Sequence, residues 1–161
     1  MKVKICGITH PEDAEYAVEA GADYIGVIFS DRSKRKVMLS KAKNIADVAR
    51  KGEAEPVGVF VDEKEEQIIS ICEQIGIKTV QLHGSNSRKS LQGLLPKYSI
   101  ILAVAGEFQI PASVIPLYDN GFGGTGVSFN WKDFSPPQNT PWILAGGLNP
   151  DNVAQAIAML N

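Results

Sequence analysis

The sequence predicts a parallel α/β fold of the (β/α)-barrel type, and three observations lead to it. Short apolar runs alternate with segments of helical periodicity along the chain. Most of these runs are apolar throughout, which is typical of parallel strands that are covered on both faces. Polar and glycine-rich residues recur directly after the runs, and in a barrel all such positions meet at the face that carries active sites.

The alternative is an open, doubly wound sheet, in which only one or two such loops converge where the strand order reverses. The first apolar run is not followed by a GxGxxG motif, the glycine pattern of dinucleotide-binding sheets. The barrel is therefore preferred. Residues 1–161 are expected to form a single barrel domain. A complete barrel has eight strands and seven are predicted, so a C-terminally truncated barrel without the eighth strand and last helix is expected.

Seven segments are predicted to be strands. They are rich in apolar and β-branched residues, and Gly, Pro or polar residues bound them. In chain order they cover residues 3–6, 23–29, 56–61, 78–83, 98–105, 113–119 and 141–147.

Helices are predicted after several of these strands, over residues 11–20, 41–51, 64–75 and 152–160. Thr9 and Pro11 are expected to begin the first helix, and Ser40 is expected to cap the second. Gly21 and Gly52 are expected to end them. The polar segment after the fourth strand is expected to hold a short helix.

Composition and charge exclude several classes of function. The 161 residues are 44% hydrophobic and 21% charged, and the net charge is −2. Binding to nucleic acid therefore has little electrostatic support. No apolar run approaches the ~18 residues that span a bilayer, and the N-terminal apolar stretch is too short for a signal peptide. A cytoplasmic protein without a nucleic-acid or membrane partner is expected.

The two cysteines lie in different settings. Cys72 lies at helical spacing from Ile68 and Ile75, which is typical of a small buried side chain. Cys6 ends the first strand, and Gly7 after it allows the backbone to turn and a ligand to approach. A thiol at a barrel mouth acts as a base or nucleophile when its pKa is lowered. The alternative for Cys6 is an inert, buried strand cysteine.

Asp119 ends the sixth apolar run, where a carboxylate must be solvated, paired or functional. The alternative is a turn aspartate, because Asn120 and Gly121 after it are turn-forming residues.

Two glycine-rich loops are candidate anion sites, residues 121–126 and residues 145–152. The second contains Gly146 and Gly147 and leads into a helix. Backbone N–H groups at such loops and at helix N-termini bind phosphate groups. Each glycine run alone is also explained by tight turns.

Basic residues gather in the loop after the second strand, at Arg32, Lys34, Arg35 and Lys36. A solvated basic loop is one interpretation, and an arginine that grips a substrate carboxylate is the other. His83 closes the fourth strand, where it either bonds locally or contacts a ligand. The chain has no His, Cys or carboxylate cluster with the spacing of a metal site, so no metal is expected.

Taken together, several motifs resemble the phosphoribosylanthranilate isomerase family of tryptophan biosynthesis. In chain order they are KICGIT (4–9), AGADYIGVIF (20–29), SKRKV (33–37), VGVFV (57–61), VQLHG (80–84), Asp119, GGTGVSFNW (123–131) and LAGGLNPDNV (144–153). They follow the family's order over nearly the whole chain. Asn130 is a departure, because the family more often has FDW there.

The resemblance implies an Amadori rearrangement of N-(5-phosphoribosyl)anthranilate, a small-molecule substrate, without a cofactor. It implies that Cys6 is the general base and Asp119 the general acid. Arg35 matches the arginine that holds the anthranilate carboxylate, and Gly146 and Gly147 match half of the phosphate site. His83 is a further candidate for substrate binding.

Family members have roughly two hundred residues or more, the low end for such barrels. Their eighth strand supplies the other half of the phosphate site, so the 161-residue chain is expected to turn over poorly. Open barrel edges are also expected to allow self-association. The alternative function is a non-catalytic module that binds a phosphorylated ligand or acts in assembly. Another phosphosugar isomerase is a third interpretation, which Cys6, Arg35 and Asp119 together disfavour.

Overall fold

The computed structural model describes residues 1–104, 110–119, 128 and 130–160. The chain divides into two compact units, Met1–Ile100 and Ile101–Asn161. The described strands are β1 (Lys4–Cys6), β2 (Tyr24–Ile28), β3 (Glu55–Phe60), β4 (Thr79–Leu82), β5 (Ser99–Val104), β6 (Val114–Tyr118) and β7 (Ile143–Leu144). The helices are α1 (Pro11–Glu19), α2 (Leu39–Lys51), α3 (Glu65–Ile75), α4 (Ser85–Lys89), α5 (Leu91–Leu94), a 3₁₀ turn η1 (Trp131–Asp133) and α6 (Val153–Leu160).

The strands are hydrogen-bonded in the order of the chain, from β1 to β7. The pairs β1–β2, β2–β3, β3–β4 and β6–β7 are parallel. A doubly wound sheet reverses its strand order at a switch point, whereas a (β/α)-barrel adds each strand beside the previous one. The strand order therefore supports the predicted barrel-type topology over the doubly wound alternative.

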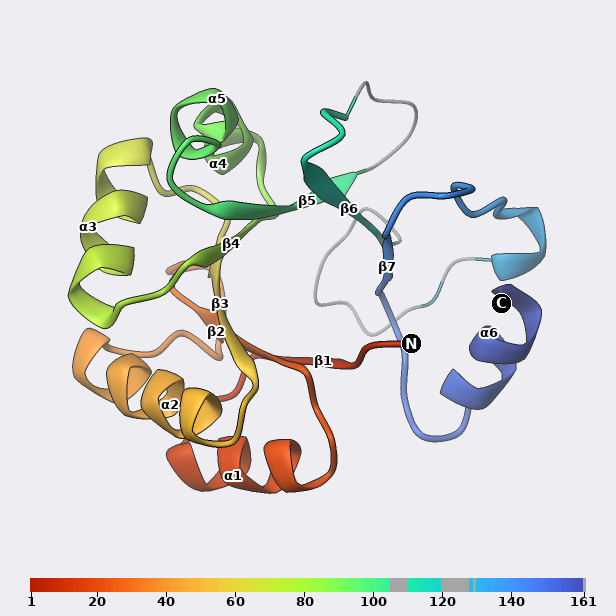
Figure 1. Cartoon of the computed structure of the whole chain (residues 1–161), viewed down its shortest axis with the longest axis horizontal. Coiled ribbons are helices and arrows are strands. Elements are labelled where there is room, and N and C mark those ends of the chain that lie inside the picture. The colour runs from red at the N-terminus through yellow and green to blue at the C-terminus, as the bar shows by residue number, and fades with distance from the viewer. Residues whose placement is uncertain (105–109, 120–127, 129, 161) are drawn as a thin grey trace. The chain divides into compact units, whose positions relative to one another are not determined.

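In the first unit, helices α1, α2 and α3 lie along the outer side of strands β1 to β4 (Figure 1). The core between these layers is aliphatic and aromatic. Its large, fully buried side chains include Ile25 and Val27 of β2, Phe60 of β3, Ile45 of α2 and Ile68 of α3. Burying a side chain of this size stabilises a fold by about 1.5–3 kcal/mol, so this core holds the strand ends that carry the functional residues.

The helix bounds agree with the predictions to within two residues, but the cap proposed at Ser40 is wrong. Ser40 is the second residue of α2, and Met38 precedes this helix without a side-chain cap. The N–H of Val37 donates to the carbonyl of Ile28, which keeps the chain beside β2 until the helix begins. Pro11 does begin α1, but the residue at the cap position is His10, not Thr9.

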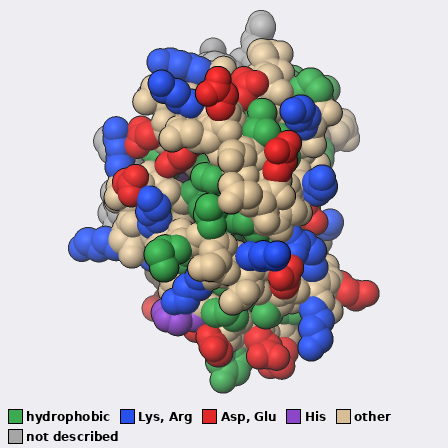
Figure 2. Space-filling view, turned by 90° about the vertical axis from the view of Figure 1, so that its left-hand side faces the viewer, with side chains coloured by type: hydrophobic (Ala, Val, Ile, Leu, Met, Phe, Trp, Pro, Cys, Tyr) green, Lys and Arg blue, Asp and Glu red, His purple; other side chains and the backbone are tan. Residues whose placement is uncertain are grey.

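Figure 2 shows the side of the molecule that lies on the left in Figure 1, where α2 and α3 are placed. Basic and acidic side chains are interspersed over it, without a stripe of either sign. This distribution gives a polyanion no continuous basic surface on that face. No described helix is long and apolar enough to cross a membrane.

In the second unit, β6 and β7 pair in parallel, with Tyr118 opposite Leu144. Tyr118 also belongs to an aromatic cluster with Phe134 and Trp142. The ring centroids of Phe134 and Trp142 lie 4.9 Å and 6.4 Å from that of Tyr118. The cluster packs at the carboxyl end of β6, directly before Asp119.

Candidate functional site

Strands β1 to β4 are parallel, so the segments that follow them leave the sheet at one edge. These segments carry most of the functional residues that the sequence predicted in the first unit. They are Cys6 with Gly7 at β1, residues 30–37 after β2, residues 61–64 after β3, and His83 with Gly84 after β4. The candidate site of the first unit is built at this edge.

Cys6 is the last residue of β1, and its side chain is half-buried rather than enclosed. Gly7 after it has a φ of +81°, a conformation that L side chains rarely adopt. The N–H groups of Gly7 and Ile8 both donate to the carbonyl of Gly26, at 2.8 Å and 3.2 Å. The glycine thus turns the chain away from the sheet immediately beyond the thiol.

The thiol of Cys6 lies over Gly26, its register partner on β2. A β-carbon at Gly26 would stand 2.8 Å from the Cys6 sulfur, which is too close for real contacts. Gly26 therefore provides the space that the thiol occupies. This need was not read from the sequence, although a glycine inside a strand indicates a close approach of another group.

Arg35 places its guanidinium directly on the Cys6–Gly7 turn. Its Nη1 donates to the carbonyl of Cys6 at 2.8 Å, and a β-carbon on Gly7 would collide with the guanidinium. Its backbone N–H donates to the Ser33 hydroxyl at 3.1 Å, which holds the loop in this turn. An exposed cation therefore lies on the backbone of the residue that carries the half-buried thiol.

The other basic residues of this loop differ from Arg35 in their partners. Arg32 pairs with Asp62 at 2.6 Å, and Lys36 pairs with Asp31 at 2.5 Å. Among the described residues, Arg35 forms no ion pair. Its positive charge is therefore not neutralised by a described carboxylate, an arrangement compatible with the carboxylate-gripping interpretation.

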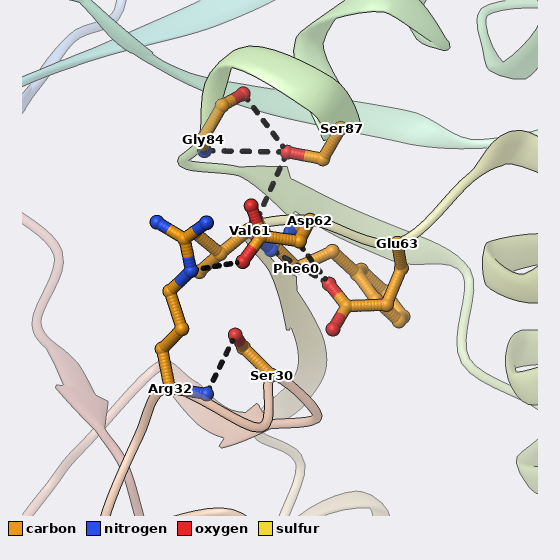
Figure 3. Close-up of polar contacts among 8 residues, drawn as sticks. All are labelled: Ser30, Arg32, Phe60, Val61, Asp62, Glu63, Gly84 and Ser87. Carbon is orange, nitrogen blue, oxygen red and sulfur yellow. Dashed lines mark hydrogen bonds and ion pairs between the residues drawn. The ribbon is translucent and has the colours of Figure 1, made fainter.

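The loops after β2, β3 and β4 are tied to one another by polar contacts (Figure 3). The Arg32–Asp62 pair joins the loop after β2 to the loop after β3. Glu63 accepts hydrogen bonds from the N–H groups of Val61 and Asp62 at 2.8 Å and 3.1 Å. These contacts fix the loop that carries Arg35.

A buried hydroxyl makes the next connection. Ser87 of α4 is fully buried, and its Oγ donates to the carbonyl of Phe60 at 3.1 Å. The same hydroxyl also accepts from the N–H of Gly84 at 3.3 Å. The end of β3 and the turn after β4 are therefore joined through one side chain (Figure 3).

His83 is half-buried at the end of β4, and its N–H donates to the carbonyl of Phe60 at 2.9 Å. Its Nδ1 lies 3.2 Å from the side-chain nitrogen of Gln81. Gln81 is buried, and its side-chain oxygen has no hydrogen-bond partner among the described residues. The sequence reasoning missed Gln81, although a polar residue inside an apolar run, two positions before His83, indicates that both share one face of the strand.

Cys72 is buried on α3, as predicted. Burial raises the pKa of its thiol from 9.0 to about 12, and the nearby Glu73 adds to the shift. This thiol therefore stays protonated and unreactive at neutral pH, which leaves Cys6 as the thiol available for chemistry among the described residues.

In the second unit, Asp119 directly follows β6 and is half-buried. The N–H of Ala145, which follows β7, donates to the carbonyl of Tyr118 at 2.8 Å. This bond brings the ends of β6 and β7 together. Asp119 and the turn after β7 therefore leave neighbouring strands at the same edge.

The turn after β7 is built from two consecutive left-handed glycines, Gly146 with a φ of +86° and Gly147 with a φ of +67°. Among the described residues, neither N–H donates a backbone hydrogen bond. The side chain of Asn152 donates to the Gly147 carbonyl at 2.9 Å, and its oxygen accepts from the N–H of Asn149 at 2.8 Å. These bonds hold the turn, whose two glycines precede α6 in the chain, and backbone N–H groups of such turns bind anions.

Two sequence features of the second unit need separate mention. The first glycine-rich loop, residues 121–126, lies outside the described residues. Asn130 caps η1, because its side chain accepts from the N–H of Lys132 at 3.2 Å and donates to Asp133 at 2.6 Å. Asn and Asp are both favoured at such a cap, so this departure from the family motif leaves the local structure intact.

Sequence comparison finds one matching family. Residues 3–161 match the family model for N-(5′-phosphoribosyl)anthranilate isomerase. The enzyme of that name from Chlamydia caviae is 58% identical over 169 aligned residues, which cover 100% of this chain and 82% of the relative. That from Chlamydia felis is 59% identical over the same shares of the two chains.

Structure comparison agrees. The crystal structure of phosphoribosylanthranilate isomerase from Thermotoga maritima superimposes with a TM-score of 0.83 and 33% identity, over 99% of this chain and 83% of the other. A second crystal structure of such an isomerase contains reduced 1-(o-carboxyphenylamino)-1-deoxyribulose 5-phosphate. It has a TM-score of 0.77 and 31% identity over 99% of this chain and 82% of the other. These likenesses confirm the predicted barrel-type fold.

Proposed function

Because the chain belongs to the N-(5′-phosphoribosyl)anthranilate isomerase family, we propose that it carries out that isomerisation in L-tryptophan biosynthesis. The substrate is an aldose amine, and the product is 1-(2-carboxyphenylamino)-1-deoxy-D-ribulose 5-phosphate. The reaction is therefore an aldose–ketose rearrangement. The family likeness supports a catalyst over the alternative of a non-catalytic binding or assembly module. The chain spans 82% of the length of its Chlamydia relatives.

The rearrangement needs a general acid and a general base. We assign the acid to Asp119, whose carboxyl group donates a proton to the furanose ring oxygen as the bond from that oxygen to C1′ breaks. The open-chain product of this step is a protonated imine. Cys6, as the thiolate, then removes the proton from C2′ and the electron pair forms an enolamine. Protonation at C1′, together with loss of the proton of the 2′-hydroxyl group, converts the enolamine to the ketose.

The observation that carries this proposal is the contact between Arg35 and the Cys6 turn. The Arg35 guanidinium donates to the backbone carbonyl of Cys6 at 2.8 Å, and it has no ion pair among the described residues. A planar guanidinium with free N–H groups matches a carboxylate. Arg35 is therefore assigned to the anthranilate carboxylate, which brings the sugar carbons of the substrate to the thiol.

The phosphate is assigned to the turn after β7. Gly146 and Gly147 form a left-handed turn between β7 and α6, and backbone N–H groups in such turns bind anions. His83 at the end of β4 is assigned to substrate contact as well, because it lies on the same strand edge as Cys6 and Arg35.

A cytoplasmic location is also proposed. Cys6 and Cys72 are both free thiols, which suits a reducing compartment. Self-association of the chain stays a prediction.

The test is turnover of N-(5′-phosphoribosyl)anthranilate by the purified chain, followed by the absorbance or fluorescence of its anthranilate group. Cys6→Ala is expected to lower kcat about 100-fold or more, the usual effect of losing a general base. Cys72→Ala is the matched control, and its kcat should stay close to that of the unmodified chain, because Cys72 is buried on α3.

Binding separates the enzyme from the alternatives. Reduced 1-(o-carboxyphenylamino)-1-deoxyribulose 5-phosphate should bind both the unmodified chain and Cys6→Ala in calorimetry. A chain that neither binds this compound nor turns over the substrate would contradict the proposal. Turnover that survives in Cys6→Ala would contradict the role of the thiol.

A further inference from the structure

The feature that carries a further inference is Lys4, a second cation beside the Cys6 thiol. Lys4 and Cys6 are two residues apart on β1, and successive side chains of a strand point to opposite faces of the sheet. The two side chains therefore share one face of β1. Ile5 between them points to the other face.

Gly26 on β2 brings the two side chains together. A β-carbon at Gly26 would stand 2.8 Å from the Cys6 sulfur and 3.1 Å from the Lys4 ammonium nitrogen. Both atoms thus reach into the space over one glycine. Because each lies about 3 Å from a common point, they are at most about 6 Å apart, within the range where one charge favours its opposite.

The Lys4 ammonium has no other polar partner in the described part of the chain. It forms no hydrogen bond or ion pair there, although its side chain is half-buried. The other charged and titratable groups of this region have contacts of their own. Arg35 lies on the Cys6 carbonyl, Tyr24 is the register partner of Lys4 on β2, and Glu55 on β3 accepts from Thr79 at 2.9 Å.

We propose that Lys4 is a positioning residue for the isomerase reaction, whose ammonium holds Cys6 in the thiolate form that removes the C2′ proton. A thiolate is the basic form of cysteine, and a neighbouring lysine stabilises it. Cys6 takes up the proton while Lys4 keeps its own, so Lys4 does not transfer a proton itself. The inference rests on the proposed function for Cys6 as the base.

The test is the rate at which iodoacetamide alkylates Cys6 as a function of pH, located by peptide mass spectrometry. In Lys4→Met the pH of half-maximal rate should rise by about one unit, which lowers the rate at pH 7 about tenfold. Lys4→Arg keeps the positive charge, so its alkylation rate should depend on pH as that of the unmodified chain does. Lys2→Met is the matched control, because the Lys2 ammonium lies over the Tyr24 ring, 5.4 Å from its centroid.

Steady-state kinetics supply the second readout. Lys4→Met should lower kcat about tenfold at pH 7 with KM unchanged, and the loss should shrink as the pH rises. A rise in KM with kcat unchanged would overturn the proposal, because Lys4 would then be a substrate contact. An alkylation profile identical to that of the unmodified chain would also overturn it.

Lys4→Gln is the control for folding, because it is uncharged but polar. It should show the same shift in alkylation and the same loss of kcat as Lys4→Met. Equal losses in Lys4→Arg and Lys4→Gln would overturn the electrostatic role, whether or not Lys4→Met folds. Alkylation does not require turnover, so it distinguishes failure of this inference from failure of the proposed function. A shifted alkylation profile without isomerase activity would contradict the proposed function alone.

Discussion

At the scale of single residues, the same amino-acid type lies in two opposite environments in this chain. Cys72 is enclosed on α3, where burial raises the pKa of its thiol to about 12. Cys6 lies half-exposed at a strand end with Arg35 on its carbonyl and Lys4 near its sulfur. The environment, and not the residue type, therefore decides which thiol is inert and which is available for proton transfer.

Cys72 leads to a prediction about stability at alkaline pH. Its thiol ionises near 9.0 in the unfolded chain but only near 12 in the folded one. The unfolded state then binds fewer protons between these values, so the free energy of unfolding falls as the pH rises from 9 to 12. Below pH 9 this contribution is fully present.

Urea unfolding at pH 8, 9.5 and 11 measures this effect. Cys72→Ala should lose less stability between pH 8 and pH 11 than the unmodified chain does. Tyr98→Phe is the companion variant, because burial and then Cys72 raise the pKa of Tyr98 as well. The same alkaline loss in Cys72→Ala as in the unmodified chain would contradict the prediction.

At the scale of elements, the loops after β2, β3 and β4 are joined by two contacts of different strength. The Arg32–Asp62 pair is largely exposed, with 76% of the arginine and 31% of the aspartate side chain accessible. Solvent screens such a pair, and it contributes about 0–1 kcal/mol. The Ser87 hydroxyl is buried, and its removal leaves the Gly84 N–H without this acceptor.

Ser87→Ala should therefore lower the free energy of unfolding by about 1–3 kcal/mol, the cost of an unpaired buried group. Asp62→Asn, the control on the same loop cluster, should cost less than about 1 kcal/mol. Urea unfolding of the two variants measures the difference. A larger loss in Asp62→Asn than in Ser87→Ala would contradict this ranking.

The elements also show how far the sequence alone could predict the fold. Apolar runs predicted all seven described strands, because parallel strands are buried on both faces. The seventh was predicted over residues 141–147, but β7 is only Ile143–Leu144. The left-handed Gly146 and Gly147 end it early. The cap of α2 was missed because a bond from Val37 to β2, not local sequence, decides where that helix begins.

The candidate site was predictable in part. Residue types at strand ends indicated Cys6 and Asp119, since a barrel places such positions at one face. The family resemblance indicated Arg35, in the loop after the second strand. The contact of Arg35 with Cys6 joins residues 29 apart in sequence, and only the folded chain shows it. Lys4 and Gln81 could not be predicted in this way, because each stands inside a strand and not at its carboxyl end.

At the scale of the whole molecule, the strands follow one another in chain order from β1 to β7. The family match covers residues 3–161. In this topology the candidate residues lie at the carboxyl ends of strands or in the loops that follow them, as in other barrels. The central claim is that the thiol of Cys6, at the end of β1, is the general base of an isomerase.

The most direct test of that claim is the release of deuterium from C2′ of N-(5′-phosphoribosyl)anthranilate in a single turnover. The unmodified chain and Cys72→Ala should release the label into water or transfer it to the product. Cys6→Ala should bind the substrate and leave the label at C2′. Loss of the label from C2′ in Cys6→Ala at the rate of the unmodified chain would contradict the account.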